Sequence, residues 1–428
     1  MKRNEIMGMK NRKLVFITAR LPYPATSGRK NVMYNYCKIL NEVLEFSITV
    51  ISFLEKDDNA EIKPEFIDEV IVLENVSGKQ KMKNLLTKTL LTRKMPMQVA
   101  LFYDPNIKRK IQKELKRINP AVVITDMVRT TEYGKEFEGY KIADLDDMIS
   151  IRYERQMNMN MRSVNPYGAY LYTMPATIQK ILELNFLKKM ILGNEIKLLK
   201  KYERSIAKEY DKTVFVAQHE ADILNKELNL KKALGVPLGV DLKYFSEYFG
   251  KLNVEPNTVA FLGAMSVAHN ESGVIHFIEN ILPLIREKKP DTKFIVVGGG
   301  VTEKLRTYRN DFIRFTGRVE DVRTVIGKCQ VFVCPLTFGS GIKTKNLEAM
   351  AMGIPVVTTS IGAENINAVE GKDWLVEDEN QLFADAVVKI MNDKELYNEL
   401  RKNGYQYVKD NFTWKVAEEK MKELFKEV

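Results

Sequence analysis

A glycine-rich turn followed by two lysines and a glutamate stands between a predicted strand and a predicted helix in the last quarter of the chain. The apolar run at 331–334 is typical of a buried parallel strand, and the apolar spacing over 345–352 predicts a short helix. Gly341 lets the backbone approach a ligand, and the free N–H groups of a helix start attract anions. Lys343 and Lys345 add positive charge at the same place. The segment therefore suits a phosphate or a diphosphate.

Glu348 lies one turn into this predicted helix. A carboxylate at that place can accept hydrogen bonds from vicinal hydroxyl groups, so the whole set suits a sugar or ribose attached to a diphosphate. The alternative is a helix with solvated lysines and a glutamate that is favoured by the helix dipole. The segment alone does not decide between these two interpretations.

The stretch EAMAMGIPVV at 348–357 is similar to the carboxyl-side motif of the family 4, or group 1, retaining glycosyltransferases. That family typically has Glu, seven residues, a second Glu and then Ala-Met-Ala-x-Gly-x-Pro-Val-Val. Ser340 stands where many members carry the first Glu, and 339–348 resembles a subset with Gly-x-Gly-x-Lys-x-Lys-x-Leu-Glu. The resemblance implies a donor site that includes Ser340, Gly341, Lys343, Lys345 and Glu348.

The resemblance extends along most of the chain, strongly after Val259 and weakly between about 150 and 211. In the second half, Gly263 and His269 fall in the loop after the first strand, and Glu364 falls in the turn IGAEN. The resemblance implies that these three residues also line the donor site. The other matching segments are 259–299, 315–322 (FTGRVEDV), 239–245 (GVDLKYF) and 17–40.

Strand and helix candidates alternate along the chain, which predicts parallel sheets covered by helices on both faces, an α/β fold. The resemblance implies the GT-B fold, in which two Rossmann-like domains face each other across a cleft. We expect residues 1–248 to form the acceptor-binding domain and 249–428 the nucleotide-sugar domain. The last helix, at 414–425, is expected to cross back to the first domain or else to cover its own. The strand candidates are 14–17, 48–53, 70–73, 121–125, 141–144, 213–217, 259–262, 294–297, 313–316, 331–335, 356–359 and 374–376.

The first half offers a second set of polar residues at strand ends. Gly28 ends the loop after the opening strand and Arg29 begins the next helix. This turn suits the donor diphosphate or the acceptor, or else is a plain strand-to-helix turn. Asp126 and Arg129 follow the strand at 121–125, and many family members carry a His near position 126. We assign Gly28 to the donor; the acceptor-binding candidates are Arg29, Asp126 and Arg129. The candidate catalytic residues are Lys343, Lys345 and Asp126.

Composition favours a protein with an anionic partner. The chain has 428 residues, a length that predicts two domains, and its hydrophobic content of 45% is that of a globular protein. Its formal net charge is +10. Phosphate donors, nucleic acids and acidic membranes all suit that charge, but no aromatic-basic platform for nucleic acid is present in the sequence.

The basic segment 147–211 could rest on an anionic membrane surface or could consist of ordinary surface helices. Without a signal sequence or a run of 18 apolar residues, we expect a cytoplasmic protein, either free or peripheral at the inner face of the membrane.

These observations predict a retaining hexosyltransferase that moves a sugar from a nucleoside-diphosphate donor to a hydroxyl of a glycan or lipid-linked acceptor, in cell-surface polysaccharide or glycoconjugate synthesis. The three histidines have no metal-ligand spacing and no Asp-x-Asp metal motif is evident in a suitable loop, so neither a metal nor another cofactor is expected. No side chain is an evident base, which agrees with the front-face route proposed for the family. Two alternatives stay open: a nucleotide-sugar isomerase of the same fold, and a binding protein of this fold that has lost turnover.

Overall fold

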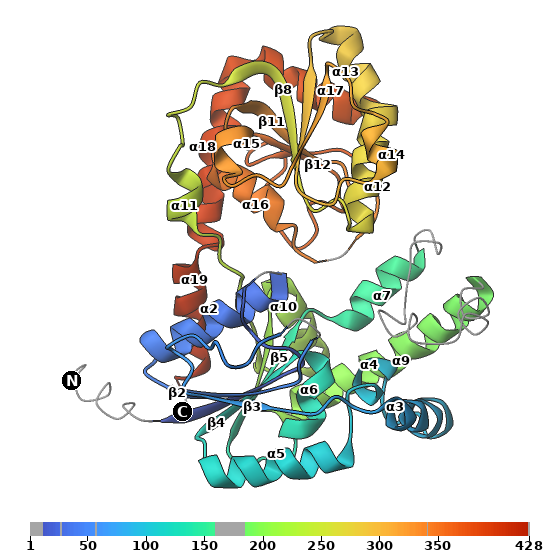
Figure 1. Ribbon diagram of the computed structural model, residues 1–428, viewed down its shortest axis with the longest axis vertical. Helices are drawn as coiled ribbons and strands as arrows, with labels where there is room; N and C mark the ends of the chain where they lie inside the picture. Colours follow the sequence, from blue (N-terminus) through green and yellow to red (C-terminus); the bar gives the residue numbers. More distant parts are fainter. Residues whose placement is uncertain (1–11, 26–27, 56–57, 159–184, 340, 427–428) are drawn as a thin grey trace. The chain divides into compact units, whose positions relative to one another are not determined.

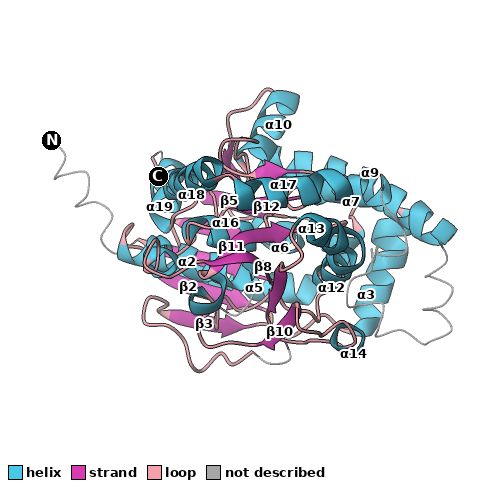
Figure 2. Ribbon diagram, turned by 90° about the horizontal axis from the view of Figure 1, so that it is seen from above, coloured by secondary structure: helices cyan, strands magenta, loops and turns pink. Residues whose placement is uncertain are grey.

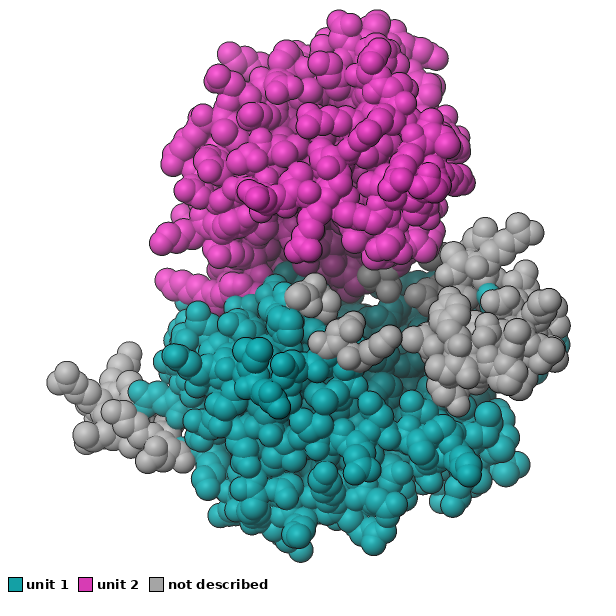
Figure 3. Space-filling view, in the orientation of Figure 1, with its two compact units in different colours: residues 1–238, 417–428 teal, residues 239–416 magenta. Residues whose placement is uncertain are grey.

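The chain divides into two compact units in the computed structural model, which describes residues 12–25, 28–55, 58–158, 185–339 and 341–426 (Figure 1). Unit 1 comprises Met1–Leu238 and Ala417–Val428, and unit 2 comprises Gly239–Val416 (Figure 3). The division falls after Leu238 rather than after 248, where the sequence placed it.

The described part of unit 1 contains a seven-stranded sheet in the order β3-β2-β1-β4-β5-β6-β7. Every neighbouring pair of strands is parallel. The central strands β1 and β4 are buried along almost their whole length, as continuous apolar runs predict. The strands are β1 (Lys13–Thr18), β2 (Ser47–Ser52), β3 (Glu69–Val72), β4 (Val122–Asp126), β5 (Tyr140–Asp146), β6 (Lys212–Phe215) and β7 (Ala233–Gly235).

Local sequence sets the ends of the helices in unit 1. In α5 (Pro105–Ile118), the carboxylate of Asp104 accepts a hydrogen bond of 2.7 Å from the backbone N–H of Asn106, and Asn119 ends the helix in the left-handed region. The other helices are α2 (Gly28–Glu42), α3 (Gly78–Asn84), η1 (Leu85–Leu91), α4 (Met97–Ala100), α6 (Met127–Gly134), α7 (Ile149–Asn158), α9 (Asn185–Glu209) and α10 (Gln218–Leu228). The basic segment expected at 147–211 lies partly outside the described residues, and α7 and α9 cover its two ends.

The described part of unit 2 contains a six-stranded parallel sheet in the order β10-β9-β8-β11-β12-β13. The chain adds strands on one side of β8 and then returns to add β11 on its other side. In open parallel sheets, ligands bind beyond the carboxyl ends of the strands at such a reversal. The strands are β8 (Glu255–Leu262), β9 (Lys293–Val297), β10 (Ile313–Gly317), β11 (Cys329–Cys334), β12 (Val356–Thr358) and β13 (Leu375–Val376).

Helices cover the strands of unit 2 (Figure 2). Aromatic rings pack against one another in the core of this unit. The ring centres of Phe277 and Phe294 are 4.5 Å apart, and Phe383 completes the cluster at 6.2 Å from Phe277. All three rings are fully buried, and each stabilises the fold by about 2–3 kcal/mol. The helices are α11 (Leu242–Ser246), α12 (Ala268–His276), η4 (Phe277–Ile281), α13 (Leu282–Lys288), α14 (Glu303–Arg306), α15 (Arg323–Ile326), α16 (Thr344–Ala351), α17 (Asn380–Asn392) and α18 (Lys394–Asn411).

The last helix, α19 (Trp414–Leu424), begins in unit 2 and ends in unit 1. The ring of Phe425 lies 5.1 Å from that of Phe46, and Tyr140 donates a hydrogen bond of 3.0 Å to the carbonyl of Leu424. The expectation that this helix crosses back to the first domain is therefore confirmed.

The predicted strands are confirmed, and α16 occupies the segment in which a short helix was expected. The sequence prediction missed β7, which is three residues long and lies at the edge of the sheet. Within the described ranges, every helix is too short or too polar to cross a lipid bilayer.

Candidate functional site

The predicted glycine turn lies at the reversal point of the unit 2 sheet. It follows β11, and the loop that follows β8 lies next to it, because β8 and β11 are paired strands. Gly339 and Gly341 adopt φ values of +135° and +76°, which side chains disfavour. A Cβ atom on Gly339 would lie 3.6 Å from the side chains of both His269 and Lys343. The turn therefore passes directly beside the loop after β8.

The loops after β8 and β9 pack so closely that they require glycine. A Cβ atom on Gly298 would lie only 1.9 Å from the carbonyl oxygen of Gly263. A Cβ atom on Gly263 would lie 2.9 Å from the ammonium of Lys345. Gly263, predicted from the resemblance, therefore allows the lysine to reach this edge of the sheet.

Lys345 is held by neutral groups. Its ammonium donates a hydrogen bond of 2.5 Å to Oδ1 of Asn270 and lies 4.3 Å from the ring centre of Phe261. Asn270 is oriented in turn, because its Nδ2 donates to the carbonyl of Ala264 at 2.9 Å. Burial lowers the pKa of Lys345 to about 8, and the charge of Lys343 acts in the same direction. The ammonium is thus a desolvated cation, and within the described ranges no carboxylate forms an ion pair with it.

Lys343 is buried at the end of the glycine turn. Its ammonium donates a hydrogen bond of 2.6 Å to the carbonyl of Gly341 and lies 3.9 Å from a carboxylate oxygen of Glu364. Only 5% of the side chain is exposed. The structure thus brings together three residues that the sequence assigned to the donor site, and Lys343 also fixes the turn itself.

His269 stands beside both lysines. Burial and the charges of Lys345 and Lys343 lower its pKa to about 4. Its ring meets Phe338 edge to face, with the ring centres 6.4 Å apart. At neutral pH the imidazole is therefore uncharged and can act as a hydrogen-bonding group.

Glu348 lies in α16, and burial raises its pKa, while a hydrogen bond to Thr344 and the charge of Lys345 act in the opposite direction. The helix begins without a side-chain cap, and the backbone N–H of Asn346 donates to the carbonyl of Lys343 at 2.9 Å, which leaves the N–H groups of Thr344 and Lys345 to meet an anion. Ser340, also assigned to the donor, lies outside the described residues.

Two acceptor candidates of unit 1 are joined by ion pairs. Arg29, at the start of α2, contacts Asp126 and Asp144 at 2.6 Å each and Asp146 at 2.9 Å. Burial raises the pKa of Asp144 to about 6 despite this partner. The sequence analysis missed Asp144 and Asp146, although the pair DLD at the end of a predicted strand was a usable signal. Gly28 precedes Arg29, and nothing would obstruct a Cβ atom there.

The backbone is strained at this edge of unit 1. Met127, directly after Asp126, has φ +57°, and Asp146 has φ +69°. Each left-handed non-glycine residue costs about 1 kcal/mol or more, and such positions cluster at functional sites. Arg129, the third acceptor candidate, does not join the carboxylates and instead donates a hydrogen bond of 3.0 Å to Gln98.

The donor candidates therefore fall into one group in unit 2, apart from Gly28, which lies in unit 1 with the acceptor candidates. The sequence analysis missed Asn270, the residue that positions Lys345. No local signal marks that asparagine, because its role depends on contact with a residue far along the chain.

Part of the chain matches a known protein family. The family model described as "Glycosyl transferases group 1" matches residues 256–393. An uncharacterized 44.6 kDa protein of the cps region of Klebsiella pneumoniae is 21% identical over 94% of this chain and 96% of its own length. CapM of Staphylococcus aureus, a capsular polysaccharide biosynthesis glycosyltransferase, is 22% identical over 44% of this chain and 50% of its own length.

A solved structure shares the fold along the whole chain. HepE of Anabaena, solved in complex with UDP, covers 97% of this chain and 100% of its own, with a TM-score of 0.62 and 11% identity. Residues 256–393 thus match the group 1 glycosyltransferases, and the architecture shared along the chain shows that this protein has the GT-B fold.

Proposed function

We propose that this protein is a group 1 glycosyltransferase that takes its sugar from a nucleoside-diphosphate donor and transfers it with retention of configuration. One observation carries the proposal: Lys345 places a desolvated ammonium at the reversal point of the unit 2 sheet, with no carboxylate ion-pair partner among the described residues. A cation that has lost its hydration without gaining an opposite charge attracts an anionic ligand. A diphosphate next to Lys345, Lys343 and the start of α16 meets that need.

The same groups suit the chemistry of the transfer. Negative charge grows on the leaving diphosphate as the bond to the sugar breaks, and positive groups already in place lower that barrier most. Lys343 and Lys345 would supply this charge, and the carboxylate of Glu348 would accept hydrogen bonds from the ribose. Neutral His269 would donate a hydrogen bond to the sugar or phosphate. A leaving phosphate oxygen would take the acceptor proton, so that the acceptor attacks on the face from which the phosphate leaves.

The same proposal includes a nucleotide sugar as the donor and transfer without a metal ion. HepE, which has the same fold, has also been solved with UDP-glucose, and this supports a nucleotide sugar as donor here. Because two lysines can balance the diphosphate charge, transfer should need neither a metal ion nor another cofactor. Turnover that is unchanged in EDTA is the expected result, and loss of turnover that returns with Mg²⁺ or Mn²⁺ would contradict it.

We place the acceptor in unit 1, in the synthesis of a cell-surface polysaccharide or glycoconjugate. The relationship to CapM and to a protein of a cps region supports that setting. Asp126 is fully buried; its Oδ1 accepts from Arg29, whereas its Oδ2 has no hydrogen-bond partner within the described ranges. An acceptor hydroxyl that donates to Oδ2 would satisfy this carboxylate and would be positioned for attack.

An anionic membrane surface is the proposed location of unit 1. Two neighbouring segments, α3 with η1 and the start of α9, expose large apolar side chains, and Leu91 and Phe186 are 78% and 77% exposed. Leu85 and Ile191 pack on the same small cluster, so the segments are in contact. The sequence from 75 to 103 contains no Asp or Glu. Its basic residues are Lys79, Lys81, Lys83, Lys88, Arg93 and Lys94.

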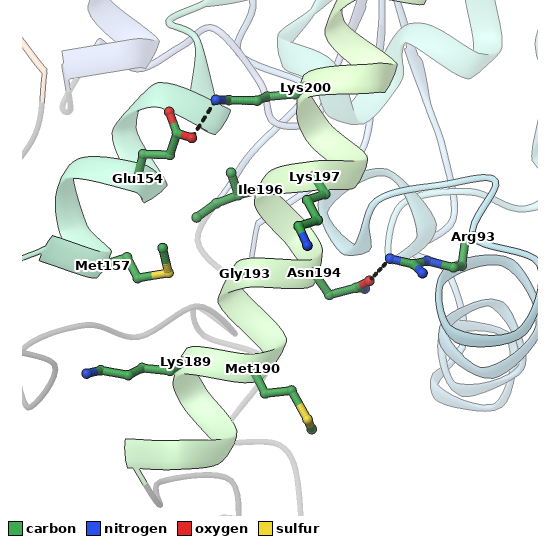
Figure 4. A pocket seen from close by; sticks show the side chains of 10 residues that line it. All are labelled: Arg93, Glu154, Met157, Lys189, Met190, Gly193, Asn194, Ile196, Lys197 and Lys200. Atoms are coloured by element: carbon green, nitrogen blue, oxygen red, sulfur yellow. Dashed lines mark hydrogen bonds and ion pairs between the residues drawn. The ribbon is translucent and has the colours of Figure 1, made fainter.

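A basic cavity lies between these segments and α7. It has a volume of about 620 Å³, and Arg93, Lys189 and Lys197 line it together with Met157 and Met190 (Figure 4). Apolar side chains surrounded by cations suit the interface of an anionic bilayer. Sedimentation with vesicles should show binding when they contain phosphatidylglycerol and little binding when they are pure phosphatidylcholine. Leu91→Glu should weaken that binding, whereas Val369→Glu, at an exposed apolar position of unit 2, should not.

One assay separates the proposed activity from its two alternatives. A thermal-shift screen of nucleoside-diphosphate sugars first identifies the stabilising donor. Release of nucleoside diphosphate that depends on an added glycan or lipid-linked acceptor supports transfer. A changed sugar from the donor alone would indicate an isomerase, and stabilisation without any turnover would indicate a binding protein.

A further inference from the structure

Three arginines follow three neighbouring strands at the carboxyl edge of the unit 1 sheet. Arg20 lies just after β1, Arg129 in the first turn of α6 after β4, and Arg152 in α7 after β5. Strand β4 pairs with β1 on one side and with β5 on the other. The topology therefore brings three guanidinium groups to one part of the sheet edge. Only Arg129 had been singled out from the sequence.

Neutral groups hold Arg129. Its Nε donates a hydrogen bond of 3.0 Å to Oε1 of Gln98, and its Cζ lies 5.2 Å from the ring centre of Phe102. Gln98 is fixed, because its Nε2 donates to the hydroxyl of Tyr153 at 2.9 Å and its backbone N–H donates to Glu195 at 3.0 Å. In the part of the chain that the structure describes, Arg129 has no ion pair with a carboxylate. This guanidinium is oriented, and its charge has no direct partner there.

Arg20 and Arg152 each retain an unused donor. Arg20 contacts Glu55 at 3.3 Å and Arg152 contacts Asp147 at 3.2 Å, in both cases through a terminal nitrogen. The Nε atoms of both arginines are buried and meet no hydrogen-bond acceptor among the described residues. Buried donors without an acceptor are rare, and each needs an explanation.

The charges of Arg20 and Arg152 both act on Arg129. Burial lowers the pKa of Arg129, and the positive charge of Arg20 is the next cause, with that of Arg152 acting in the same direction. The nearby charge of Asp126 opposes this shift, but that carboxylate is already paired with Arg29. Burial acts to lower the pKa of Arg152 as well, but the charge of Asp147 helps to raise it above the ordinary value. A bound anion would therefore relieve Arg129 most, because its charge has the least compensation.

We propose that Arg20, Arg129 and Arg152 bind a phosphate or diphosphate group of the acceptor. Guanidinium forks match the paired oxygens of phosphates, and three of them can surround a doubly charged group. The acceptor is then a sugar carried on a phosphate ester rather than a free neutral glycan, because a neutral glycan brings no negative charge to the guanidinium groups. This inference rests on the proposed transfer, because it names the chemical class of its acceptor.

Isothermal titration with inorganic pyrophosphate tests the site. The wild-type protein should bind two pyrophosphates, one at the donor lysines and one at the arginines. Arg129→Gln should weaken pyrophosphate binding at the arginine site by roughly tenfold or more and leave the lysine site intact. Lys345→Met should weaken binding at the lysine site and leave the arginine site intact. Arg20→Gln and Arg152→Gln should each weaken the same site as Arg129→Gln. Arg117→Gln, at an exposed arginine after the middle of α5, is the matched control and should change neither site.

The outcomes distinguish this inference from the proposed activity. Two pyrophosphate sites that survive all three arginine substitutions would overturn the arginine site, even if nucleotide binding at the lysines is intact. Loss of the arginine-dependent site alone supports it, even if no nucleotide sugar is ever turned over. Two further ligands then identify the acceptor: a short-chain prenyl diphosphate represents a lipid-linked acceptor, and a sugar 1-phosphate represents a soluble one. The ligand of the correct class should bind the arginine site more tightly than pyrophosphate does.

Discussion

The ammonium of Lys345 donates a hydrogen bond of 2.5 Å to the side-chain oxygen of Asn270, and this bond joins the helix after β11 to the helix after β8. These strands flank the reversal point of the unit 2 sheet. The amide fixes the direction of the lysine without neutralising it. The lysine can therefore meet an anionic ligand with its full charge and with little loss of side-chain freedom on binding.

Removing either donor lysine should weaken nucleotide binding while the fold survives. Lys345→Met and Lys343→Ala each delete a charge-assisted contact to the diphosphate, which should lower donor affinity by about 2 kcal/mol, or roughly thirtyfold, and also lower turnover. Calorimetric titration with nucleoside diphosphates measures the affinity. Lys293→Met, at the first residue of β9 and thus at the opposite edge of the sheet, is the control and should behave as wild type. Unchanged affinity in both site variants would remove the lysines from the donor site.

Donor affinity should fall as the pH rises through about 8. Burial lowers the pKa of Lys345 to about 8, so the free protein carries this charge below that pH and loses it above. Because the diphosphate binds the charged form, the dissociation constant should rise by up to roughly tenfold per pH unit above the pKa. Lys345→Arg, which stays charged, should flatten the profile. A wild-type profile that is flat from pH 7 to pH 10 would contradict this assignment.

Replacing Glu348 should separate the ribose from the phosphates. Glu348→Ala removes the proposed acceptor of the ribose hydroxyls and leaves the lysines in place, so nucleoside diphosphates should bind about tenfold more weakly. Inorganic pyrophosphate, which has no ribose, should bind as to wild type. Equal losses for both ligands would instead show that Glu348 acts through the lysines or through the fold.

Unit 1 should lose stability as the pH rises from about 4.5 to about 7. Burial raises the pKa of Glu203 to about 7, while its two hydrogen bonds with Ser150 act against the shift. The folded state holds this proton more tightly than the unfolded chain. The resulting stabilisation of the folded state is complete at low pH and is lost as the pH rises through about 7. Burial raises the pKa of Glu195 and Glu220 in the same direction.

Glu203→Gln tests this linkage, because the amide can keep both hydrogen bonds to Ser150 and cannot ionise. The free energy of unfolding of the variant minus that of wild type should be larger at pH 8 than at pH 5, by on the order of 1–3 kcal/mol. Denaturant unfolding of both proteins at the two pH values measures this. The same difference at both pH values would mean that Glu203 is not protonated in the folded protein.

Sequence reasoning reached the features that are local in the chain. The strands were predictable because buried parallel strands are continuous apolar runs. The glycine turn before α16 was predictable because Gly341, Lys343 and Glu348 lie within a few residues of one another. What could not be predicted depends on distant contacts. Lys345 and Asn270 are 75 positions apart, and Arg29 and Asp144 are 115 apart.

The arginine cluster shows the same limit. Arg20 and Arg152 carry no motif, and only the strand order brings them to the sheet edge near Arg129. The three residues of β7 were missed because so short an edge strand has no periodicity to recognise.

The central claim is that a diphosphate binds beside Lys343 and Lys345, and the titration of His269 tests it most directly. The chain has three histidines, so ¹³C-labelled histidine gives few NMR signals, and His269→Gln assigns the relevant one. In the free protein this ring should titrate near pH 4, because burial and the two lysine charges lower its pKa. A bound nucleoside diphosphate offsets those charges, so the pKa of His269 should rise by about one unit. If nucleotide binds and the pKa of His269 does not move, the diphosphate lies elsewhere and the account is wrong.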